Sequence, residues 1–502
     1  MTDNNNHRLK VLAEAARAIE VTGAAADMTE ATSLTADSRR VTPGGVFVAV
    51  RGVHTDGHKY IAGAVAAGAR AVVCEEVPAD ASADVSWIRV ADASVALGLL
   101  ASQWYGNPSR RMTLVGVTGT NGKTTIATLL YEMARLTGHK AGLLSTVVNK
   151  IDERDVPSTH TTPDPLELNE LLWQMAEAGC DFAAMEVSSH AAAQHRIAGH
   201  DYDGGIFTNL TRDHLDYHGT FANYLQAKQS FFDSLKPEAF ALTNADDRNG
   251  AIMVQNTAAR RYTYSLRSDA DFRGRVIEDR LDGMLLSLNN VEVETMFAGR
   301  FNASNLTAVY GASILLGTER MEALTAMSRL VPVSGRFQPV VSADGVTAII
   351  DYAHTPDALV NVLDTVNEVK RRGSRVITIC GAGGDRDRGK RPIMAAEAAR
   401  RSWRVILTSD NPRSEDPVAI IAEMRTGLDE DGQRRTLGIT DRREAIRCAT
   451  WLASPGDVIM IAGKGHETYQ IIGTQTLHFD DHEEIAAAFA ERQRLLTETD
   501  EH

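Results

Sequence analysis

The chain has 502 residues, far more than one hydrophobic core accommodates, so two to four domains are expected. Hydrophobic residues make up 43% and charged residues 24%, which is ordinary for a globular protein and excludes a largely disordered chain. The 66 acidic and 52 basic residues give a formal net charge of −14, which disfavours nonspecific binding to nucleic acid or to an anionic membrane but allows a local basic pocket for phosphates.

The cysteines and the first residues of the chain indicate its compartment. The four cysteines are widely separated and form no C-x-x-C pair, so neither a disulfide framework nor a zinc knuckle is predicted. Residues 1–10 are polar and lack the apolar stretch of a signal peptide, and no segment is long and apolar enough to cross a membrane. We therefore expect a cytoplasmic protein without membrane insertion.

Residues 1–110 are predicted to form an N-terminal α/β domain. A helical pattern at Leu9–Ala18 is followed by apolar runs that predict strands at Val46–Val50, Ala71–Cys74 and Trp87–Val90. The segment Gly106–Arg110 combines turn residues with basic ones, and the first domain boundary is predicted there.

Residues 111–333 alternate predicted strands with predicted helices. The strands are expected at Leu114–Val117, Ala183–Val187 and Gly205–Thr208, and the helices at Lys123–Leu136 and Ala303–Leu316. This alternation indicates a central, doubly wound and mostly parallel sheet with helices on both faces. Residues 263–298 favour antiparallel strands instead, with Asp282-Gly283 as a hairpin turn.

Residues 334–502 repeat the alternation and form the third predicted domain. Strands are expected at Thr347–Ile350, Arg375–Cys380, Val405–Thr408 and Val458–Ala462. This pattern is typical of a Rossmann-like doubly wound sheet, in which ligands bind at the carboxyl ends of the strands. The predicted fold class is therefore α/β with three domains.

A glycine-rich loop between a predicted strand and helix carries the strongest functional signal. Its residues are Gly119, Thr120, Asn121, Gly122, Lys123, Thr124 and Thr125. The glycines let backbone N–H groups face a phosphate, Lys123 can reach the terminal phosphates, and Thr124 has the position of a Mg²⁺ ligand. Val117 replaces the first glycine of the strict phosphate-loop pattern, so a plain turn with an exposed lysine is the alternative. The variant TGTNGKTT resembles the ATP loop of the Mur ligase and folylpolyglutamate synthetase superfamily.

Acidic and histidine residues follow the next two predicted strands. Glu186 ends one strand, and His214 follows the other, at an edge where an oxygen-preferring Mg²⁺ ion would be held with a nucleotide. Ordinary polar loop residues are the alternative. A zinc site at His214 and His218 is a further alternative, but no third soft ligand has a suitable spacing.

Further motifs occur in a fixed order along the chain. They are E-V-S-S-H, T-N-L-T-R-D-H-L-D-Y-H-G, F-N-A-S-N, S-G-R, D-Y-A-H-T-P, G-G-D-R-D-R-G-K-R and G-K-G-H-E. This order resembles that of the UDP-N-acetylmuramoyl-tripeptide synthetases, the Mur ligases that add the third amino acid to a UDP-muramoyl dipeptide. The resemblance extends from Asp37 to Glu467 and implies a monomeric ligase of peptidoglycan precursor synthesis that uses ATP and Mg²⁺.

The resemblance assigns roles around ATP. Thr124 and Glu186 would bind the metal at the phosphates, and His214 would help to hold a second metal. Lys228 matches the lysine that this family carbamylates, although from the sequence alone it is one lysine on a helix, for which a solvated face is the ordinary interpretation. The catalytic set implied is Lys123, Glu186, His214, Lys228, Arg336 and Asp351. Further ATP contacts would come from Asn305, Arg336, Asp351 and His354, with an interdomain salt bridge as the alternative for Arg336.

The resemblance also assigns the two other substrates. The UDP-muramoyl dipeptide would be bound by Ser38, Val53, His54, Thr55, His160, Thr161, Thr162, Ser188, Gln194 and Arg196. The incoming amino acid would be bound by Arg386, Asp410, Asn411, Pro412, Arg413, Gly463 and Glu467. The D-N-P-R motif resembles the version that accepts meso-diaminopimelate, because Arg413 can pair with the second carboxylate that lysine lacks. A helix-capping or surface role is the alternative for Arg413.

These assignments predict an acyl-phosphate mechanism. The glutamyl carboxylate of UDP-MurNAc-L-Ala-D-Glu would attack the γ-phosphate of ATP, and the amine of diaminopimelate would then displace phosphate. The alternatives are the lysine-adding version of the same ligase, a folylpolyglutamate synthetase, a phosphate-loop kinase and a non-enzymatic ATP-dependent switch.

Overall fold

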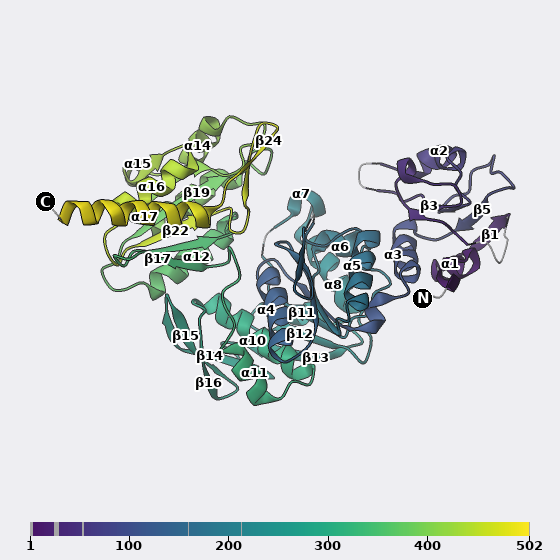
Figure 1. Ribbon diagram of the computed structural model, residues 1–502, viewed down its shortest axis with the longest axis horizontal. Helices are drawn as coiled ribbons and strands as arrows, with labels where there is room; N and C mark the ends of the chain where they lie inside the picture. Colours follow the sequence, from purple (N-terminus) through teal and green to yellow (C-terminus); the bar gives the residue numbers. More distant parts are fainter. Residues whose placement is uncertain (1–3, 25–29, 53–54, 159, 212, 501–502) are drawn as a thin grey trace. The chain divides into compact units, whose positions relative to one another are not determined.

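The computed structural model describes residues 4–24, 30–52, 55–158, 160–211 and 213–500 (Figure 1). The chain divides into two compact units, residues 1–263 with 312–318 and residues 264–311 with 319–502. The predicted domain limits after residues 110 and 333 stay predictions, since the first lies inside the first unit and the second inside the second. Each unit combines helices with mixed sheets, as an α/β protein does.

A five-stranded sheet forms the N-terminal part of the first unit, in the order β1-β5-β4-β3-β2. Its elements are α1 (Leu9–Ala15), β1 (Glu20–Gly23), β2 (Leu34–Thr35), β3 (Val46–Val48), α2 (Ile61–Ala66), β4 (Ala71–Cys74), β5 (Ser86–Arg89) and α3 (Ala93–Trp104). Helices cover both faces of β4, which is why its four residues are all apolar. The three predicted strands are confirmed. Helix α1 ends three residues before the predicted limit, where Arg17 takes a positive φ of 55°.

A second sheet in the first unit has the order β12-β11-β6-β10-β7-β8-β9. The strands β12, β11, β6, β10 and β7 are mutually parallel, whereas β8 and β9 add an antiparallel edge. The elements are β6 (Thr113–Thr118), α4 (Lys123–Leu136), β7 (Ala141–Leu144), β8 (Asn149–Ile151), β9 (Arg154–Val156), α5 (Pro165–Glu177), β10 (Phe182–Glu186), α6 (Ser189–Ala193), β11 (Gly204–Phe207), α7 (Leu215–His218), α8 (Phe221–Asp233), β12 (Phe240–Asn244) and α9 (Gly250–Met253). The predicted parallel sheet is confirmed.

The first part of the second unit combines a parallel strand pair with antiparallel ones. The first elements of this unit are β13 (Arg260–Ser265), which carries the chain over from the first unit, β14 (Phe272–Arg280), β15 (Gly283–Leu288), β16 (Val291–Thr295), α10 (Arg300–Leu315) and α11 (Arg320–Met327). Strands β13 and β14 pair in parallel, whereas β14, β15 and β16 are antiparallel as predicted. Arg280 pairs with Gly283 across the turn between β14 and β15, which confirms the hairpin predicted at Asp282-Gly283. The last turn of α10 belongs to the first unit.

A six-stranded sheet organises the rest of the second unit, in the order β17-β18-β22-β19-β20-β21, and a hairpin of β23 and β24 follows. The elements are β17 (Gln338–Val341), β18 (Thr347–Asp351), α12 (Pro356–Val369), β19 (Val376–Ala382), α13 (Lys390–Arg401), β20 (Arg404–Ser409), α14 (Pro417–Arg425), α15 (Glu430–Arg435), β21 (Thr436–Gly438), α16 (Arg442–Leu452), β22 (Val458–Ala462), β23 (Tyr469–Ile472), β24 (Gln475–His478) and α17 (Asp481–Asp500). All four predicted strands are confirmed.

Alternation along β22 explains how this sheet is covered. Val458, Met460 and Ala462 pack into the cluster that contains residues of α12, α13 and α14. Ile459 and Ile461 point to the opposite face and pack with residues of α16 and α17. Because successive side chains of a strand alternate between faces and both faces are buried, the strand is apolar throughout.

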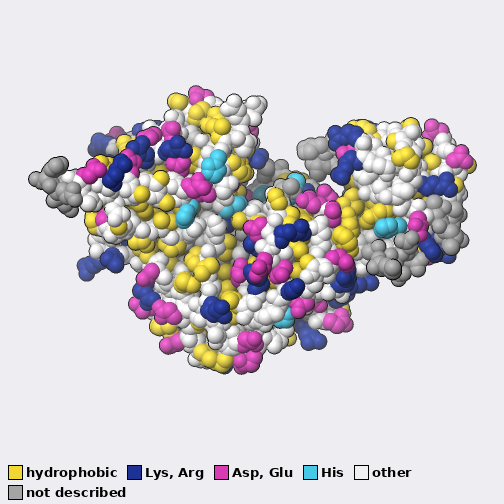
Figure 2. All heavy atoms as spheres, in the orientation of Figure 1, with side chains coloured by type: hydrophobic (Ala, Val, Ile, Leu, Met, Phe, Trp, Pro, Cys, Tyr) yellow, Lys and Arg dark blue, Asp and Glu magenta, His cyan; other side chains and the backbone are white. Residues whose placement is uncertain are grey.

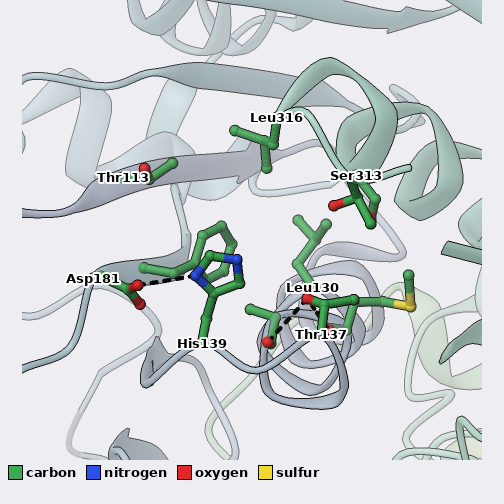
Figure 3. Close-up of a pocket in the computed structure, with 11 residues that line it drawn as sticks. Thr113, Leu130, Thr137, His139, Asp181, Ser313 and Leu316 are labelled. Carbon is green, nitrogen blue, oxygen red and sulfur yellow. Dashed lines mark hydrogen bonds and ion pairs between the residues drawn. The ribbon is translucent and has the colours of Figure 1, made fainter. Parts of the chain in front are cut away.

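Charged side chains of both signs are mixed on the visible surface, and the first unit contains a cavity. Figure 2 shows acidic and basic side chains interspersed over the visible face, without a large field of one sign. A cavity of about 250 Å³ lies at the C-terminal end of α4, at the edge of the sheet where β6 and β10 begin. Both His139 and Asp181 line it, with Nδ1 of His139 2.9 Å from a carboxylate oxygen of Asp181 (Figure 3). No helix among the described residues has the length and apolar character that a membrane span needs.

Three ion pairs join α16 to α17, and two of them lie in clearly different environments. Arg442 donates to both carboxylate oxygens of Asp481 at 2.7 Å, and both side chains are completely buried. Arg443 makes the equivalent pair with Glu484, but its side chain is 59% exposed. Removing one partner of a buried pair leaves a charge without compensation, whereas an exposed pair is screened by water.

We predict that Asp481→Asn lowers the free energy of unfolding by about 3–5 kcal/mol, because Arg442 would stay buried without its counter-ion. The matched change Glu484→Gln on the same helix should cost less than about 1 kcal/mol. Urea denaturation of both variants measures the difference. Equal losses would show that α17 is not held by the buried pair.

Candidate functional site

The phosphate loop connects β6 to α4 and requires glycine at two positions. Gly119 has a φ of +149°, and Gly122 caps the helix with a φ of +87°. A Cβ atom on Gly119 would lie 1.8 Å from Oγ1 of Thr208, so no side chain fits there. The loop therefore packs directly against the end of β11, with backbone at the amino end of α4 where anions bind.

The segment after β11 fixes the path of this loop. The backbone N–H of Asn121 donates to Oδ1 of Asn209 at 3.0 Å, and Nδ2 of Asn209 donates back to the Asn121 carbonyl at 3.1 Å. The Thr208 hydroxyl donates to the same carbonyl at 2.6 Å. Thr208 and Asn209 were not among the predicted site residues, and their position at the end of the neighbouring parallel strand is the signal that could have found them.

Two lysines converge on the loop. Lys123 donates to the carbonyls of Gly119 and Thr120 at 3.0 and 2.8 Å. Lys228 of α8 donates to the Gly119 carbonyl at 2.7 Å, and its side chain is buried. Burial, followed by the neighbouring Lys123 charge, holds the pKa of Lys228 well below its ordinary value. The solvated-face interpretation of Lys228 is therefore wrong.

Glu186 lies beside the loop because β10 pairs with β6 in parallel, with Glu186 opposite Val117. Its side chain is buried, and Oε1 accepts the backbone N–H of Thr146 at 2.7 Å. No described residue forms a hydrogen bond with its buried Oε2. Thr124 is buried in the first turn of α4. A carboxylate oxygen without a partner and a hydroxyl are oxygen ligands of the kind that Mg²⁺ prefers.

Aromatic rings gather around the predicted histidines. The ring of His214 lies 4.9 Å from that of His190 and 6.2 Å from that of Tyr224, and Nε2 of His218 lies 3.0 Å from the Ser189 hydroxyl. Tyr224, which was not predicted, shares a hydrogen bond of 3.1 Å with Thr120. Within the part of the chain that the structure describes, no three His, Cys, Asp or Glu side chains are grouped to hold a metal ion.

A polar cluster beside Glu186 contains five of the ten predicted dipeptide contacts. Arg196 donates to Oε1 of Gln194 at 2.7 and 3.0 Å and to the Thr162 carbonyl at 2.9 Å. The Thr162 hydroxyl donates to the Glu186 carbonyl at 2.9 Å and lies 3.3 Å from the Ser188 hydroxyl. The Thr146 hydroxyl donates to the Thr161 hydroxyl at 3.1 Å, and the backbone N–H of Thr146 contacts Glu186, which connects Thr161 to the cluster. The His160 side chain is exposed.

Four predicted dipeptide contacts belong to the N-terminal part of the sequence. Ser38 is half-buried in a turn that Asp37 caps, and Thr55 is exposed. Val53 and His54 lie outside the described residues.

In the second unit, predicted ATP contacts cluster at the end of β18. Asp351 accepts the backbone N–H groups of Phe337 and Ala353 at 2.7 and 2.8 Å. Burial raises its pKa to about 6, although Arg336 opposes this shift. The Arg336 guanidinium lies 4.6 Å from the centre of the Tyr352 ring, whose edge also contacts His354. Asn305 is buried on α10, where its amide donates to Asn302 at 3.3 Å.

The predicted amino-acid contacts follow the ends of β19, β20 and β22. Nδ2 of Asn411 donates to Oε2 of Glu467 at 2.8 Å. Gly463 has a φ of +121°, and a Cβ atom at this position would lie only 3.3 Å from Oδ2 of Asp410. Arg413 has a φ of +51°, and its guanidinium donates to the Gly384 carbonyl at 2.8 Å. Pro412 is buried in the same loop, and Arg386 is exposed beside Gly383.

These features define a class of protein. The site consists of a strand, a glycine loop and a helix, with a lysine and a carboxylate at the same end of a parallel sheet. This arrangement is a phosphate-loop nucleotide site in an α/β protein. Models of the Mur ligase family match three parts of the chain: the catalytic domain at residues 30–105, the middle domain at residues 117–313 and the glutamate ligase domain at residues 335–465. The chain belongs to the Mur ligase family, and its fold is the three-domain α/β fold of that family.

Individual relatives support this assignment. A UDP-N-acetylmuramoyl-L-alanyl-D-glutamate–2,6-diaminopimelate ligase from Bacteroides thetaiotaomicron is 56% identical over 481 residues, which are 96% of this chain and 99% of the relative. A solved structure of a ligase with the same name is 34% identical, with a TM-score of 0.67, and covers 92% of this chain and 96% of its own. Mycobacterium tuberculosis folylpolyglutamate synthase shares the fold at 18% identity, with a TM-score of 0.60, over 74% of this chain and 92% of its own.

Proposed function

We propose that this chain is an ATP-dependent ligase that adds meso-2,6-diaminopimelate to UDP-N-acetylmuramoyl-L-alanyl-D-glutamate and releases ADP and phosphate. Relatives that match nearly the whole chain are named as ligases that catalyse this reaction. The observation that carries the choice of amino acid is the position of Arg413 in one loop with Asn411, which contacts Glu467. We also propose that it acts in the cytoplasm as a monomer.

ATP would bind with its phosphates at the loop of residues 119–125. Backbone N–H groups and the ammonium of Lys123 would contact the β- and γ-phosphates, because they already face the amino end of α4. Asn305, Arg336, Asp351 and His354 of the second unit would provide the other nucleotide contacts. An arginine that reaches the transferring phosphoryl group would stabilise the charge that develops on it.

The residues around Glu186 fit Mg²⁺. Thr124 and Glu186 would bind one ion at the ATP phosphates, and His214 with carbamylated Lys228 would help to hold a second. When bound, Mg²⁺ neutralises charge on the phosphates and so assists phosphoryl transfer. Only the neutral amine of a lysine reacts with CO₂, and the lowered pKa of Lys228 supports such a reaction.

The two remaining substrates would react one after the other. Ser38, Val53, His54 and Thr55 would bind the UDP moiety, whereas Arg196 and its neighbours would bind the muramoyl dipeptide. The glutamyl carboxylate attacks the γ-phosphate and forms an acyl phosphate with loss of ADP. The neutral amine of diaminopimelate then attacks the acyl carbon, and phosphate leaves as the amide forms. Exclusion of water protects the acyl phosphate from hydrolysis.

For recognition of diaminopimelate, we propose that Arg413 and Arg386 bind the distal carboxylate and Glu467 binds the ammonium on the same carbon. A guanidinium pairs with a carboxylate through two parallel hydrogen bonds, which an ammonium cannot do. Gly463 would leave space for the substrate beside Asp410.

The first prediction of this proposal concerns phosphate release from ATP in the presence of UDP-MurNAc-L-Ala-D-Glu. We expect strong release with meso-diaminopimelate and little with L-lysine or without an amino acid. Release with L-lysine alone would keep the ligase reaction and contradict the role of Arg413. No release with any amino acid would contradict the proposed function and favour a folate-type ligase.

We predict that Arg413→Ala raises KM for diaminopimelate by about 30-fold or more, since losing one partner of a desolvated charge pair costs about 2–5 kcal/mol. KM for ATP should stay within about twofold of the wild-type value, because Arg413 lies in the amino-acid cluster. Arg388→Ala, which removes an exposed arginine that pairs with Glu423, is the control. Equal rises in both KM values would contradict the assignment.

We predict that Lys228 forms a carbamate in bicarbonate buffer and that removing CO₂ lowers kcat. Because the amine must be neutral, carbamate formation should increase as pH rises through the lowered pKa of Lys228. Carbon-13 NMR with labelled bicarbonate measures the carbamate signal. A signal that persists in Lys228→Met would place the carbamate elsewhere.

A further inference from the structure

The loop that carries Asp410, Asn411 and Arg413 is fastened along its length to strand β23. The backbone N–H of Arg413 donates to the Ile471 carbonyl at 3.0 Å, and Gly473 donates to the Arg413 carbonyl at 2.7 Å. The Gln470 amide donates to the Asp410 carbonyl at 2.8 Å. These bonds hold the backbone of Arg413 at its positive φ. Strand β23 therefore fixes the backbone position from which the Arg413 side chain extends.

Lys464 lies beneath this loop and is completely buried. Its ammonium donates to Oδ1 of Asn411 at 3.1 Å and to the Tyr469 carbonyl at 2.6 Å. The same nitrogen lies 3.6 Å from one carboxylate oxygen of Asp410 and 3.6 Å from one of Glu467. A single cation therefore contacts the D-N-P-R loop, strand β23 and the G-K-G-H-E loop.

The contacts of Lys464 determine the orientation of the Asn411 amide. An ammonium and a backbone N–H can only donate, and both Lys464 and the N–H of Ile471 approach Oδ1 of Asn411. The amide nitrogen must then point the other way, toward Oε2 of Glu467. Without Lys464, one of the two donors that define this orientation is lost, and Glu467 loses a fixed neighbour.

Lys464 also lies between two carboxylates. One oxygen of Asp410 and one of Glu467 are each 3.6 Å from its nitrogen. Burial and then the Asp410 charge raise the pKa of Glu467, whereas Lys464 opposes this rise.

We propose that Lys464 is a positioning residue for the incoming amino acid, which fixes the Asn411 amide and the Glu467 carboxylate so that one ammonium is bound between the two loops. This inference rests on the proposed function. It adds to that function a residue that does not itself touch the substrate and acts through Asn411 and Glu467.

The test is Lys464→Met, which keeps most of the side-chain volume and removes the ammonium. We expect KM for diaminopimelate to rise by about tenfold or more, as for other losses of a buried polar contact, while KM for ATP and for the UDP-dipeptide stay within about twofold. A side chain with only a structural role would instead lower the active fraction, and so kcat, without this selective change in KM.

A second variant keeps the inference testable if Lys464→Met does not fold. Gln470→Leu removes the amide that holds the Asp410 carbonyl and loosens the same loop from strand β23. It should raise KM for diaminopimelate selectively as well. Lys370→Met is the matched control, because its ammonium also donates to a backbone carbonyl, that of Ser374, at 2.7 Å in the same unit.

The outcomes separate this inference from the proposed function. Folded Lys464→Met or Gln470→Leu with a wild-type KM for diaminopimelate overturns the inference alone. Equal changes in the KM values of all three substrates overturn it too. Absence of diaminopimelate-dependent phosphate release in the wild-type enzyme overturns the proposed function and this inference together.

Discussion

Parallel pairing of β6 with β10 on one side and β11 on the other is the constraint on which the nucleotide site depends. In parallel strands the carboxyl ends meet at one edge of the sheet, so the loop after Thr118, the carboxylate of Glu186 and the hydroxyl of Thr208 arrive together. The close approach of Gly119 to Thr208 locks the loop to this edge. These three strand ends position the loop, Glu186 and Thr208, and Lys228 and Tyr224 reach the loop from α8.

A buried lysine that contacts a functional loop is a feature of both units. Lys228 reaches the Gly119 carbonyl from α8, and Lys464 reaches two loops and a strand in the other unit. Burying the amine of a lysine is costly unless polar groups surround it, so each lysine restricts the positions of its partners. These contacts give the loops at the strand ends a defined geometry.

The family relationship and the amino-acid specificity depend on different parts of the molecule. Folylpolyglutamate synthase shares the fold at low identity, and a shared fold does not imply a shared substrate. In the proposed function, specificity depends on a short loop after β20, whose arginine takes a positive φ that few side chains adopt. Hydrogen bonds from β23 maintain this conformation, which links a surface hairpin to substrate choice.

Several features were predictable from the sequence alone because they depend on local order. The apolar runs of β4 and β22, the helix at Lys123–Leu136 and the turn at Asp282-Gly283 follow from periodicity and turn chemistry. The glycine loop likewise follows from its own residues. The tertiary structure alone decided that Lys228 is buried rather than solvated, that Asn209 and Tyr224 support the loop, and that Lys464 contacts Asn411 across a sequence separation of 53 residues. Such contacts link residues far apart in sequence, and no periodicity or spacing records which distant segments will pack together.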